Sequence, residues 1–258
     1  MLFIIALIKN QFNRTSSSAY HIMSMIWYGG LYMKQFNHTF NILYGICLCL
    51  AVLALARQLV PYRSFKAASA DPPAIRHIAI TFDDGPHPVY TELLLDGLKE
   101  RSVHATFFVT GENAELHPDI IKKMSEEGHL IGNHTYSHIQ LTSANREKFR
   151  QELIDTNKVI SGITGNEVLF VRPPYGTWDK KFEAELNMFP VLWTVDPLDW
   201  CSDNADRIAR KVIKNTKEND IILMHDYYES SVTAALAAID QLQAQGFTFV
   251  TVDEILFD

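Results

Sequence analysis

Short apolar runs alternate with longer segments of helical periodicity from residue 74 to the C-terminus. The apolar runs predict strands at residues 77–82, 105–110, 129–132, 167–172, 191–195, 221–225 and 248–250. The longer segments predict helices at residues 88–101, 118–127, 143–161, 179–187, 203–216 and 231–245. Strands separated by helices of this length are typical of βαβ units with parallel strands. The pattern therefore predicts an α/β fold, an incomplete (β/α)7-type barrel in a single domain, with a flat doubly wound sheet as the alternative.

Charge divides the chain into two parts. Residues 1–70 contain six Lys and Arg and no Asp or Glu, so the other residues hold 17 of the 23 basic and all 30 acidic residues, a formal net charge of −13. Such an acidic domain is a poor candidate for binding nucleic acid, whereas a neutral or cationic glycan remains open as a partner. Three cysteines, two of them in an apolar run, cannot build a disulfide framework or a thiolate metal site.

An apolar run of 15 residues, 42–56, follows a weakly basic segment that begins at Met33 and Lys34. The run is short for a membrane-spanning helix and has the length of a signal-peptide core. Small residues at 54–56 and 68–70 are candidate cleavage sites. Export is therefore expected, to the outside of the cell or to its surface, and Met33 is an alternative start. The expected division is a leader with a signal peptide or membrane anchor at 1–56, a tether at 57–73 and the main domain at 74–258.

The first predicted strand ends in two adjacent carboxylates, Asp83 and Asp84, before Gly85 and Pro86 turn the chain into a loop. Strand ends that lead into loops are where α/β enzymes place their chemistry. Neighbouring side chains on a strand point to opposite faces, so one carboxylate could hold a metal ion while the other moves a proton. Taken alone, such a doublet is more often a solvated acidic turn.

His134 and His138 follow the third predicted strand with i, i+4 spacing. In a helical turn this spacing places both imidazoles on one side, where they can converge on one cation. No Glu adjoins His134, so this is not the metalloprotease helix pattern. Alone, the pair is more often incidental surface histidine. Together with a strand-end Asp it completes a three-ligand site with a position open for water, which is the catalytic form of zinc.

Arg172 ends the fourth predicted strand and is followed by two prolines. Its guanidinium stays charged, so a buried carboxylate beside it would remain ionised and oriented. Pro173 and Pro174 stiffen the turn and leave the amides of Tyr175 and Gly176 free to point inward. The structural alternative is a rigid turn with a surface arginine.

Asp199 and Trp200 follow the fifth predicted strand, and His225 ends the sixth. A carboxylate next to a Trp suggests a sugar-binding wall with a polar partner, although Trp packs in cores equally often. A lone strand-end His is usually structural, but a His paired with a nearby Asp has a raised pKa and can be protonated near neutral pH. All of these signals lie at the carboxyl ends of different predicted strands, where a barrel gathers its active site.

Taken together, segments 81–85, 134–138, 172–175, 196–200 and 223–225 resemble the five ordered motifs of the NodB-type polysaccharide deacetylases, carbohydrate esterase family 4. The resemblance covers most of residues 74–258 and is strongest to peptidoglycan N-acetylglucosamine deacetylases. It implies an incomplete (β/α) barrel. It also implies a metal-dependent hydrolase that removes N-acetyl groups from N-acetylglucosamine residues of a polysaccharide, peptidoglycan above all, and releases acetate.

Matched residue by residue, the resemblance implies that Asp83 is the catalytic base. It implies that Asp84, His134 and His138 hold one divalent metal ion. Zinc is the first expectation for such a ligand set, and cobalt and nickel also suit His and carboxylate ligands.

The other matched positions concern proton donation and substrate contact. The resemblance implies that Arg172 orients Asp83 and that His225 is the general acid, tuned by Asp199. The implied substrate contacts are an oxyanion-binding amide and the two walls of an acetyl pocket, at Tyr175, Trp200 and Leu223.

Two other functions remain open at this point. The same motifs serve ester cleavage, so an O-acetyl esterase on a xylan-like polysaccharide is an alternative. A non-catalytic glycan-binding module on the same fold is a second alternative, although it predicts damage to a motif residue and none is damaged. An exported N-terminus indicates the bacterial cell envelope, by secretion or by an N-terminal anchor, which favours peptidoglycan over a chitin-like substrate.

Overall fold

The computed structural model describes residues 24–25, 27–28, 33, 37–38, 40–43, 46–53 and 75–257. The chain divides into two units, Met1–Ala70 and Asp71–Asp258. The described residues of the first unit are helical and exposed. None of the described helices is long and apolar enough to cross a bilayer. The tether and both candidate cleavage segments lie outside the described residues, so the division into leader, tether and domain stays a prediction.

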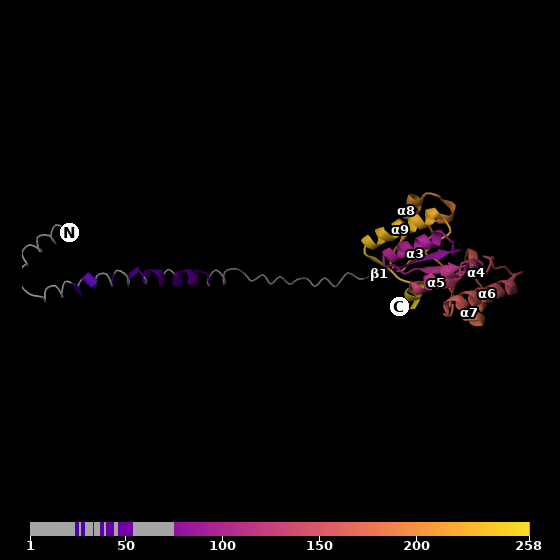
Figure 1. Cartoon of the computed structure of the whole chain (residues 1–258), viewed down its shortest axis with the longest axis horizontal. Coiled ribbons are helices and arrows are strands. Elements are labelled where there is room, and N and C mark those ends of the chain that lie inside the picture. The colour runs from indigo at the N-terminus through magenta and orange to yellow at the C-terminus, as the bar shows by residue number, and fades with distance from the viewer. Residues whose placement is uncertain are drawn as a thin grey trace, which may run out of the picture. The chain divides into compact units, whose positions relative to one another are not determined.

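A sheet of seven parallel strands forms the centre of residues 75–257 (Figure 1). Its strands are β1 (Arg76–Asp83), β2 (Thr106–Val109), β3 (Leu130–Asn133), β4 (Phe170–Val171), β5 (Phe189–Pro190), β6 (Ile221–His225) and β7 (Phe247–Phe249). From β1 to β5 each strand pairs with the next one in the chain, while β6 and β7 both pair with β1. Parallel strands surrounded by helices are the architecture of the predicted incomplete barrel, which is confirmed, and the flat alternative is wrong.

Helices connect the strands and pack in two groups (Figure 1). They are α3 (Tyr90–Glu100), α4 (Gly111–Leu116), α5 (Pro118–Glu126), α6 (Arg146–Thr164), α7 (Lys181–Leu186), α8 (Ala205–Asn215), α9 (Glu229–Ala244) and α10 (Val252–Phe257). Helix α9 packs against α3 and α8, and α6 packs against α4 and α5. Helices α4 and α10 were not predicted, whereas the six predicted helices are present with ends shifted by a few residues.

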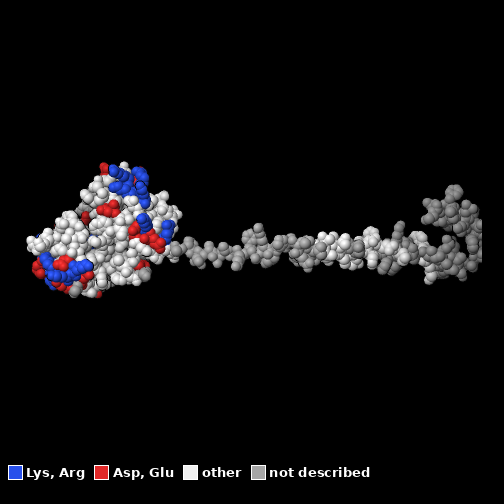
Figure 2. Space-filling model, turned by 180° about the vertical axis from the view of Figure 1, so that it is seen from behind, with Lys and Arg blue, Asp and Glu red and all other residues white. Residues whose placement is uncertain are grey.

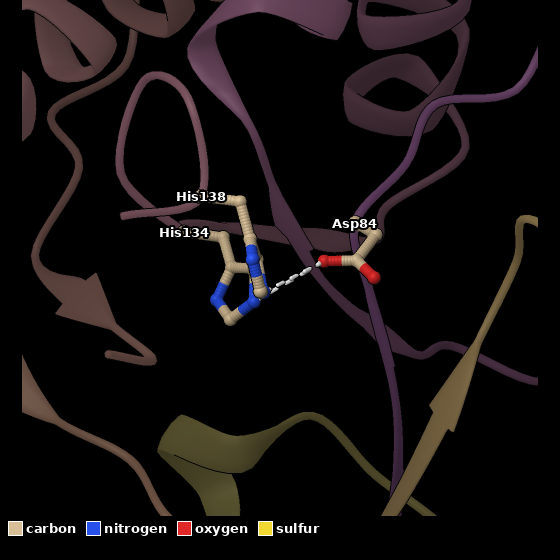
Figure 3. Close-up of side chains that lie close together, drawn as sticks. All are labelled: Asp84, His134 and His138. Carbon is tan, nitrogen blue, oxygen red and sulfur yellow. Dashed lines mark ion pairs between the residues drawn. The ribbon is translucent and has the colours of Figure 1, made fainter. Parts of the chain in front are cut away.

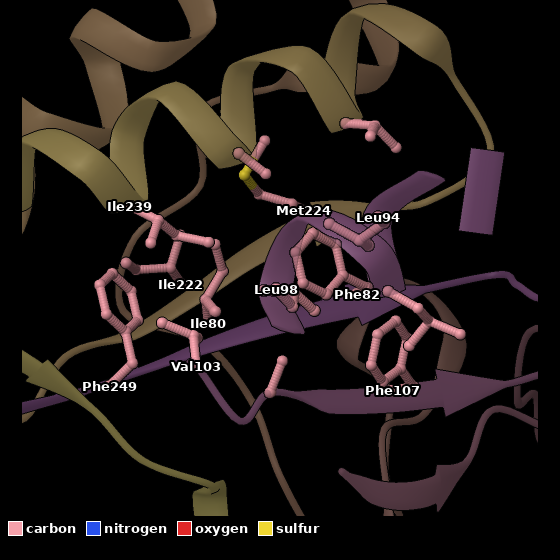
Figure 4. Packing of buried hydrophobic residues seen from close by; sticks show 14 of the residues in the cluster. Ile80, Phe82, Leu94, Leu98, Val103, Phe107, Ile222, Met224, Ile239 and Phe249 are labelled. Carbon is pink, nitrogen blue, oxygen red and sulfur yellow. The ribbon is translucent and has the colours of Figure 1, made fainter. Parts of the chain in front are cut away.

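Strand β1 divides its side chains between two apolar clusters. Ala79 packs in one of them with Phe108 and Phe170. The larger cluster, against α3 and α9, holds the alternate residues Ile78, Ile80 and Phe82 (Figure 4). Burying a side chain of this size contributes about 1.5–3 kcal/mol, so this cluster determines which face of β1 is turned toward the helices. Because strand side chains alternate, Thr81 and Asp83 share the face of Ala79, inside the barrel.

Residues 191–195, predicted as the fifth strand, do not form one. Strand β5 lies just before them, and only Val195 makes an isolated bridge, to Ile222. The carbonyls of Val191 and Leu192 accept hydrogen bonds from the Arg172 guanidinium, at 3.1 and 3.3 Å. These carbonyls are satisfied by a side chain, so this segment does not extend the sheet.

Candidate active site

Asp83 and Asp84 leave β1 with both carboxylates near the same imidazole. Asp83 is the last residue of the strand, whereas Asp84 has a left-handed backbone with φ of 74°. Oδ2 of Asp83 lies 3.9 Å from Nε2 of His134, and Oδ1 of Asp84 lies 3.4 Å from the same atom. The prediction that the two side chains point to opposite faces is wrong, because the left-handed residue interrupts the strand alternation.

Asp84, His134 and His138 each turn one ligand atom toward a common point (Figure 3). These atoms all lie within 4.8 Å of one another, and Nε2 of His138 is 3.3 Å from Oδ1 of Asp84. Oδ1 of Asp84 is buried and has no hydrogen-bond partner among the residues that the structure describes. Burial raises the pKa of Asp84, but the imidazoles around it, His134 first, lower it further than burial raises it. An ionised, unpartnered oxygen beside two imidazole nitrogens fits a divalent cation.

The segment that carries both histidines is an irregular loop. Its backbone is left-handed at Thr135 and His138, with φ of 63° and 54°. The predicted helical turn is therefore wrong, although the two imidazoles do converge, with ring centroids 4.9 Å apart. Nδ1 of His134 lies 2.6 Å from the carbonyl oxygen of Arg172. That contact makes Nδ1 the donor and leaves Nε2 as a lone-pair ligand.

Three neighbouring elements hold this histidine loop, residues 134–138. Amides of Gly111 and Glu112, at the start of α4, each donate to a loop carbonyl at 3.0 Å. The side chain of Asn133 accepts from a loop amide at 2.7 Å. Glu152 of α6 accepts from the amide of Ser137 at 3.0 Å and from its hydroxyl at 2.8 Å. Packing of α4 and α6 thus determines where the two imidazoles lie.

Arg172 is fully buried and forms an ion pair with Asp83. Its Nη1 lies 2.8 Å from Oδ1 of Asp83 and 2.5 Å from the hydroxyl of Thr81. The guanidinium also lies over the Phe108 ring, 4.2 Å from its centroid. The alternative of a surface arginine is excluded. Because Oδ1 of Asp83 is occupied by Arg172, Oδ2 is the oxygen that faces the histidines.

His225 pairs with the buried Asp199 and lies near the second carboxylate oxygen of Asp84. Asp199 accepts from the amide of His225 at 2.8 Å and from its Nδ1 at 2.9 Å. Nε2 of His225 lies 4.0 Å from Oδ2 of Asp84. Burial lowers the pKa of His225, but the hydrogen bond to Asp199 and the nearby carboxylates outweigh burial and raise it to about 9. This shift favours the protonated imidazole, and its Nε2 faces Asp84.

The three predicted substrate-contact residues differ in exposure. The Tyr175 side chain is 66% exposed, and its ring lies 5.2 Å from that of His138. Trp200 is also exposed, whereas Leu223 of β6 is buried. The prediction of a free inward amide is wrong for Gly176, which donates to the carbonyl of Pro173 at 2.9 Å.

Comparison with known proteins identifies the family. The sequence model of the family described as polysaccharide deacetylase matches residues 70–191. A peptidoglycan-N-acetylglucosamine deacetylase of Bacillus cereus is 40% identical over 187 residues, which cover 69% of this chain and 87% of that protein. The chain belongs to the polysaccharide deacetylase family. This result confirms the resemblance to NodB-type deacetylases.

Two other relatives extend further beyond the region that they share with this deacetylase family member. A second B. cereus protein of the same name is 41% identical over 181 residues, covering 67% of this chain and 66% of the relative. The Bacillus subtilis peptidoglycan-N-acetylmuramic acid deacetylase PdaC is 39% identical over 178 residues, covering 69% of this chain and 38% of PdaC. A solved structure of PdaC superposes with a TM-score of 0.68 at 38% identity, covering 71% of this chain and 91% of that one. The chain thus spans less than two thirds of the length of these two relatives.

Sequence reasoning missed three polar residues around the deacetylase-family site. Thr81 binds Arg172 and donates to the carbonyl of Ile222 at 2.7 Å. Glu152 lies on α6, where nothing in a helical pattern marks one polar position as a support for a distant loop. Asp226 directly follows His225, and no local pattern marks it as a contact to a distant segment.

Asp226 joins the loop after β6 to the loop after β1. Its Oδ2 accepts from the Thr91 hydroxyl at 2.5 Å, and burial raises its pKa to about 7. A Cβ at Gly85 would lie 2.2 Å from Oδ2 of Asp226, so only glycine permits this contact. The close approach holds the segments that directly follow Asp84 and His225 against each other.

Proposed function

We propose that the protein hydrolyses the N-acetyl groups of N-acetylglucosamine residues in peptidoglycan, with one divalent metal ion, and releases acetate. The observation that carries this proposal is the cluster of Asp84, His134 and His138 with Asp83 and His225 beside it. The names of the B. cereus relatives support N-acetylglucosamine as the sugar, whereas the name of PdaC points to N-acetylmuramic acid.

Asp84, His134 and His138 would hold the metal ion, for which we propose zinc, with cobalt and nickel as alternatives. A divalent ion held there would polarise the acetamide carbonyl and ease deprotonation of a water molecule. The orphan oxygen of Asp84 and the free Nε2 atoms supply three ligand atoms on one side.

Asp83 is proposed as the general base. Its Oδ1 is held by Arg172, so its orientation is determined and Oδ2 is directed toward the ligand cluster. Oδ2 can accept the proton of a water molecule that attacks the acetyl carbon. The amide of Tyr175 is proposed to bind the developing oxyanion, a contact worth about 3 kcal/mol when one such donor is lost.

His225 is proposed as the general acid. An amine leaves poorly without a proton, and Asp199 supports the imidazolium form of His225 that would donate one. Trp200 and Leu223 are proposed as the walls that receive the acetyl group. The exposure of Trp200 suits contact with a sugar, and the burial of Leu223 suits the floor of a small pocket.

The envelope is the proposed location of the enzyme. A leader at 1–56 would direct export, a tether at 57–73 would follow it, and residues 74–258 would act on the wall, either secreted or anchored. The apolar run at 42–56 and the names of the relatives support this arrangement.

Acetate release tests the proposal against its rivals. The full chain, loaded in turn with zinc, cobalt and nickel, is incubated with peptidoglycan, N-acetylglucosamine oligomers and acetylated xylan. We expect release from peptidoglycan, with mass analysis of wall fragments locating the lost acetyl group on N-acetylglucosamine. Release only from acetylated xylan would favour the O-acetyl esterase. Binding of glycan with no acetate from any substrate would favour the binding module.

Activity is expected to fall as the pH rises through the pKa of His225. In the free domain this pKa is about 9, so the acid is present below that pH and is lost above it. Asp199→Asn removes the charge that raises the pKa, so the alkaline limb of kcat/KM should move down by about 1–3 pH units. A bound cation lowers this pKa in parent and variant alike, so the comparison between them is the measurement.

The matched control for Asp199→Asn is Asp196→Asn. This exposed carboxylate lies in the same loop and accepts from the amide of Leu198 at 2.8 Å. The control changes the net charge by the same amount as Asp199→Asn. It should leave the alkaline limb of the kcat/KM profile at the same pH as in the parent. An unchanged limb in Asp199→Asn would remove Asp199 from its tuning role.

Releasing the histidine loop is expected to weaken metal binding. Glu152→Ala removes both contacts to Ser137, so the site loses about tenfold or more in affinity, as is usual for residues that support metal ligands. Competition with a chelator measures the affinity without an activity assay. Glu147→Ala, at an exposed position of the same helix, serves as the control. Equal affinities in the two variants would contradict the role of Glu152.

A further inference from the structure

Helix α8 presents four basic side chains on one face. Arg207, Arg210, Lys211 and Lys214 have i, i+3, i+4 and i+7 spacing, which places them along one side of the helix. The opposite side is buried through Ile208, Ala209 and Val212. We call the four basic residues the α8 basic face.

The α8 basic face is not neutralised by the protein itself. None of its four side chains forms an ion pair with a residue in the described part of the chain. On other helices, by contrast, Lys99 pairs with Glu127 and Arg101 pairs with Asp240. Figure 2 agrees: the patch at the top of the domain, where α8 lies in Figure 1, is mostly blue, whereas the other blue patches lie beside red ones.

The sequence makes this concentration of charge unusual for the domain. Residues 207–217 contain five of the 17 basic residues that follow residue 70, and no acidic residue. The unit as a whole has a formal net charge of −13. A polyanion would therefore be repelled by most of the domain and attracted to α8.

The α8 basic face adjoins the loop that carries Asp199 and Trp200, which forms the rim of the proposed substrate site. Nζ of Lys211 donates to the carbonyl of Pro197 at 2.8 Å. Pro197 belongs to the loop that carries Asp199 and Trp200. The side chain of Asn204 caps α8 by accepting from the amide of Arg207 at 2.9 Å, so the helix begins directly after that loop.

We propose that the α8 basic face binds the carboxylates of peptide stems on the glycan strand whose sugar occupies the active site. The inference rests on the proposed function and adds how that substrate is recognised, through its anionic peptide stems as well as through its sugars. Electrostatic attraction acts over about 8 Å at physiological ionic strength, so stems near the rim are within its reach. Complementary charge of this kind chiefly speeds association and selects the partner.

A charge-removal variant of the full chain tests the proposal. Arg207→Gln, Arg210→Gln and Lys214→Gln are combined, and Lys211 is kept because it holds the loop. We expect kcat/KM on peptidoglycan to fall about tenfold at low salt, the lower end of electrostatic steering effects, with no change on neutral N-acetylglucosamine oligomers. Added salt should bring the parent down to the level of the variant.

The control combines Lys99→Gln, Lys122→Gln and Lys158→Gln. These lysines are highly exposed, lie on α3, α5 and α6, and change the net charge by the same amount. The control should match the parent on both substrates. Equal losses in both triple variants, or a loss on the neutral oligomer, would overturn the proposal, and so would full activity of the α8 variant on peptidoglycan.

Sedimentation with wall fragments measures binding independently of catalysis and identifies the group that α8 binds. Binding of the parent should fall when the stem carboxylates are amidated and should survive removal of phosphate-containing polymers. The opposite pattern would identify phosphate as the ligand and overturn the proposal. If the parent released no acetate from any glycan, the proposed function would fail, while this binding measurement would still decide the role of α8.

Discussion

Asp83→Asn is expected to abolish measurable acetate release and to leave the metal in place. Loss of a general base alone costs about 10²–10⁴-fold in rate. Asp83 is not one of the three clustered ligands, and its Oδ2 is 3.9 Å from the nearest imidazole nitrogen, so the cluster itself is unchanged. Acetate assays and metal analysis of the same preparation measure both parts of the prediction. Normal turnover would refute Asp83 as the base.

Stability must be followed in the same variant. Arg172 is fully buried, and removing the charge of its partner costs up to about 3–5 kcal/mol when nothing replaces it. The asparagine oxygen can still accept from Nη1, so we expect a smaller loss and a folded protein. Urea unfolding of the parent and the variant measures this loss in the free energy of unfolding. A folded, metal-loaded and inactive Asp83→Asn protein is the result that assigns the loss to chemistry.

His134→Ala is expected to empty the metal site and so to remove all activity. His134 supplies one of three ligand atoms, and its Nδ1 contact with the Arg172 carbonyl orients it. The two remaining ligands, Asp84 after β1 and His138 on the histidine loop, should not hold an ion through dialysis. Metal analysis of the dialysed protein is the measurement. Stoichiometric metal in the variant would overturn the ligand set.

The matched control for His134→Ala is His129→Ala. His129 is also buried, and its Nδ1 accepts from the amide of Ala105 at 3.1 Å, before the other end of β3. The control loses a buried imidazole of the same size but leaves all three ligands. It should therefore lose stability and retain metal. Loss of metal in both variants would show that the metal is lost because the fold is destabilised, and not because a ligand is missing.

Continuous apolar runs were the best guide to the fold. The prediction for β6 matches the observed strand, since 221–224 is an unbroken buried run that ends at His225. Helix α4 was missed because its six residues, with two Glu and one Asn, are too few to show a helical period. The failure at 191–195 has a different cause, since an apolar run gives no sign that a distant arginine will bind its carbonyls.

The histidine loop shows how far the candidate site could be predicted. Spacing alone suggested that His134 and His138 share a cation, and their ligand atoms do lie together. The helical turn was wrong because two left-handed residues shape the loop. That conformation depends on hydrogen bonds from α4 and α6, whose partners are distant in sequence.

The sequence by itself determined the strand and helix alternation, the polar residues at strand ends and the uneven distribution of charge, because each of these depends on residues that are neighbours in the chain. Only the tertiary structure decided which oxygen of Asp83 is free, how His225 keeps its proton and why Gly85 must be a glycine. Those properties arise from close contacts between segments at least 26 residues apart, and local patterns carry no information about such contacts.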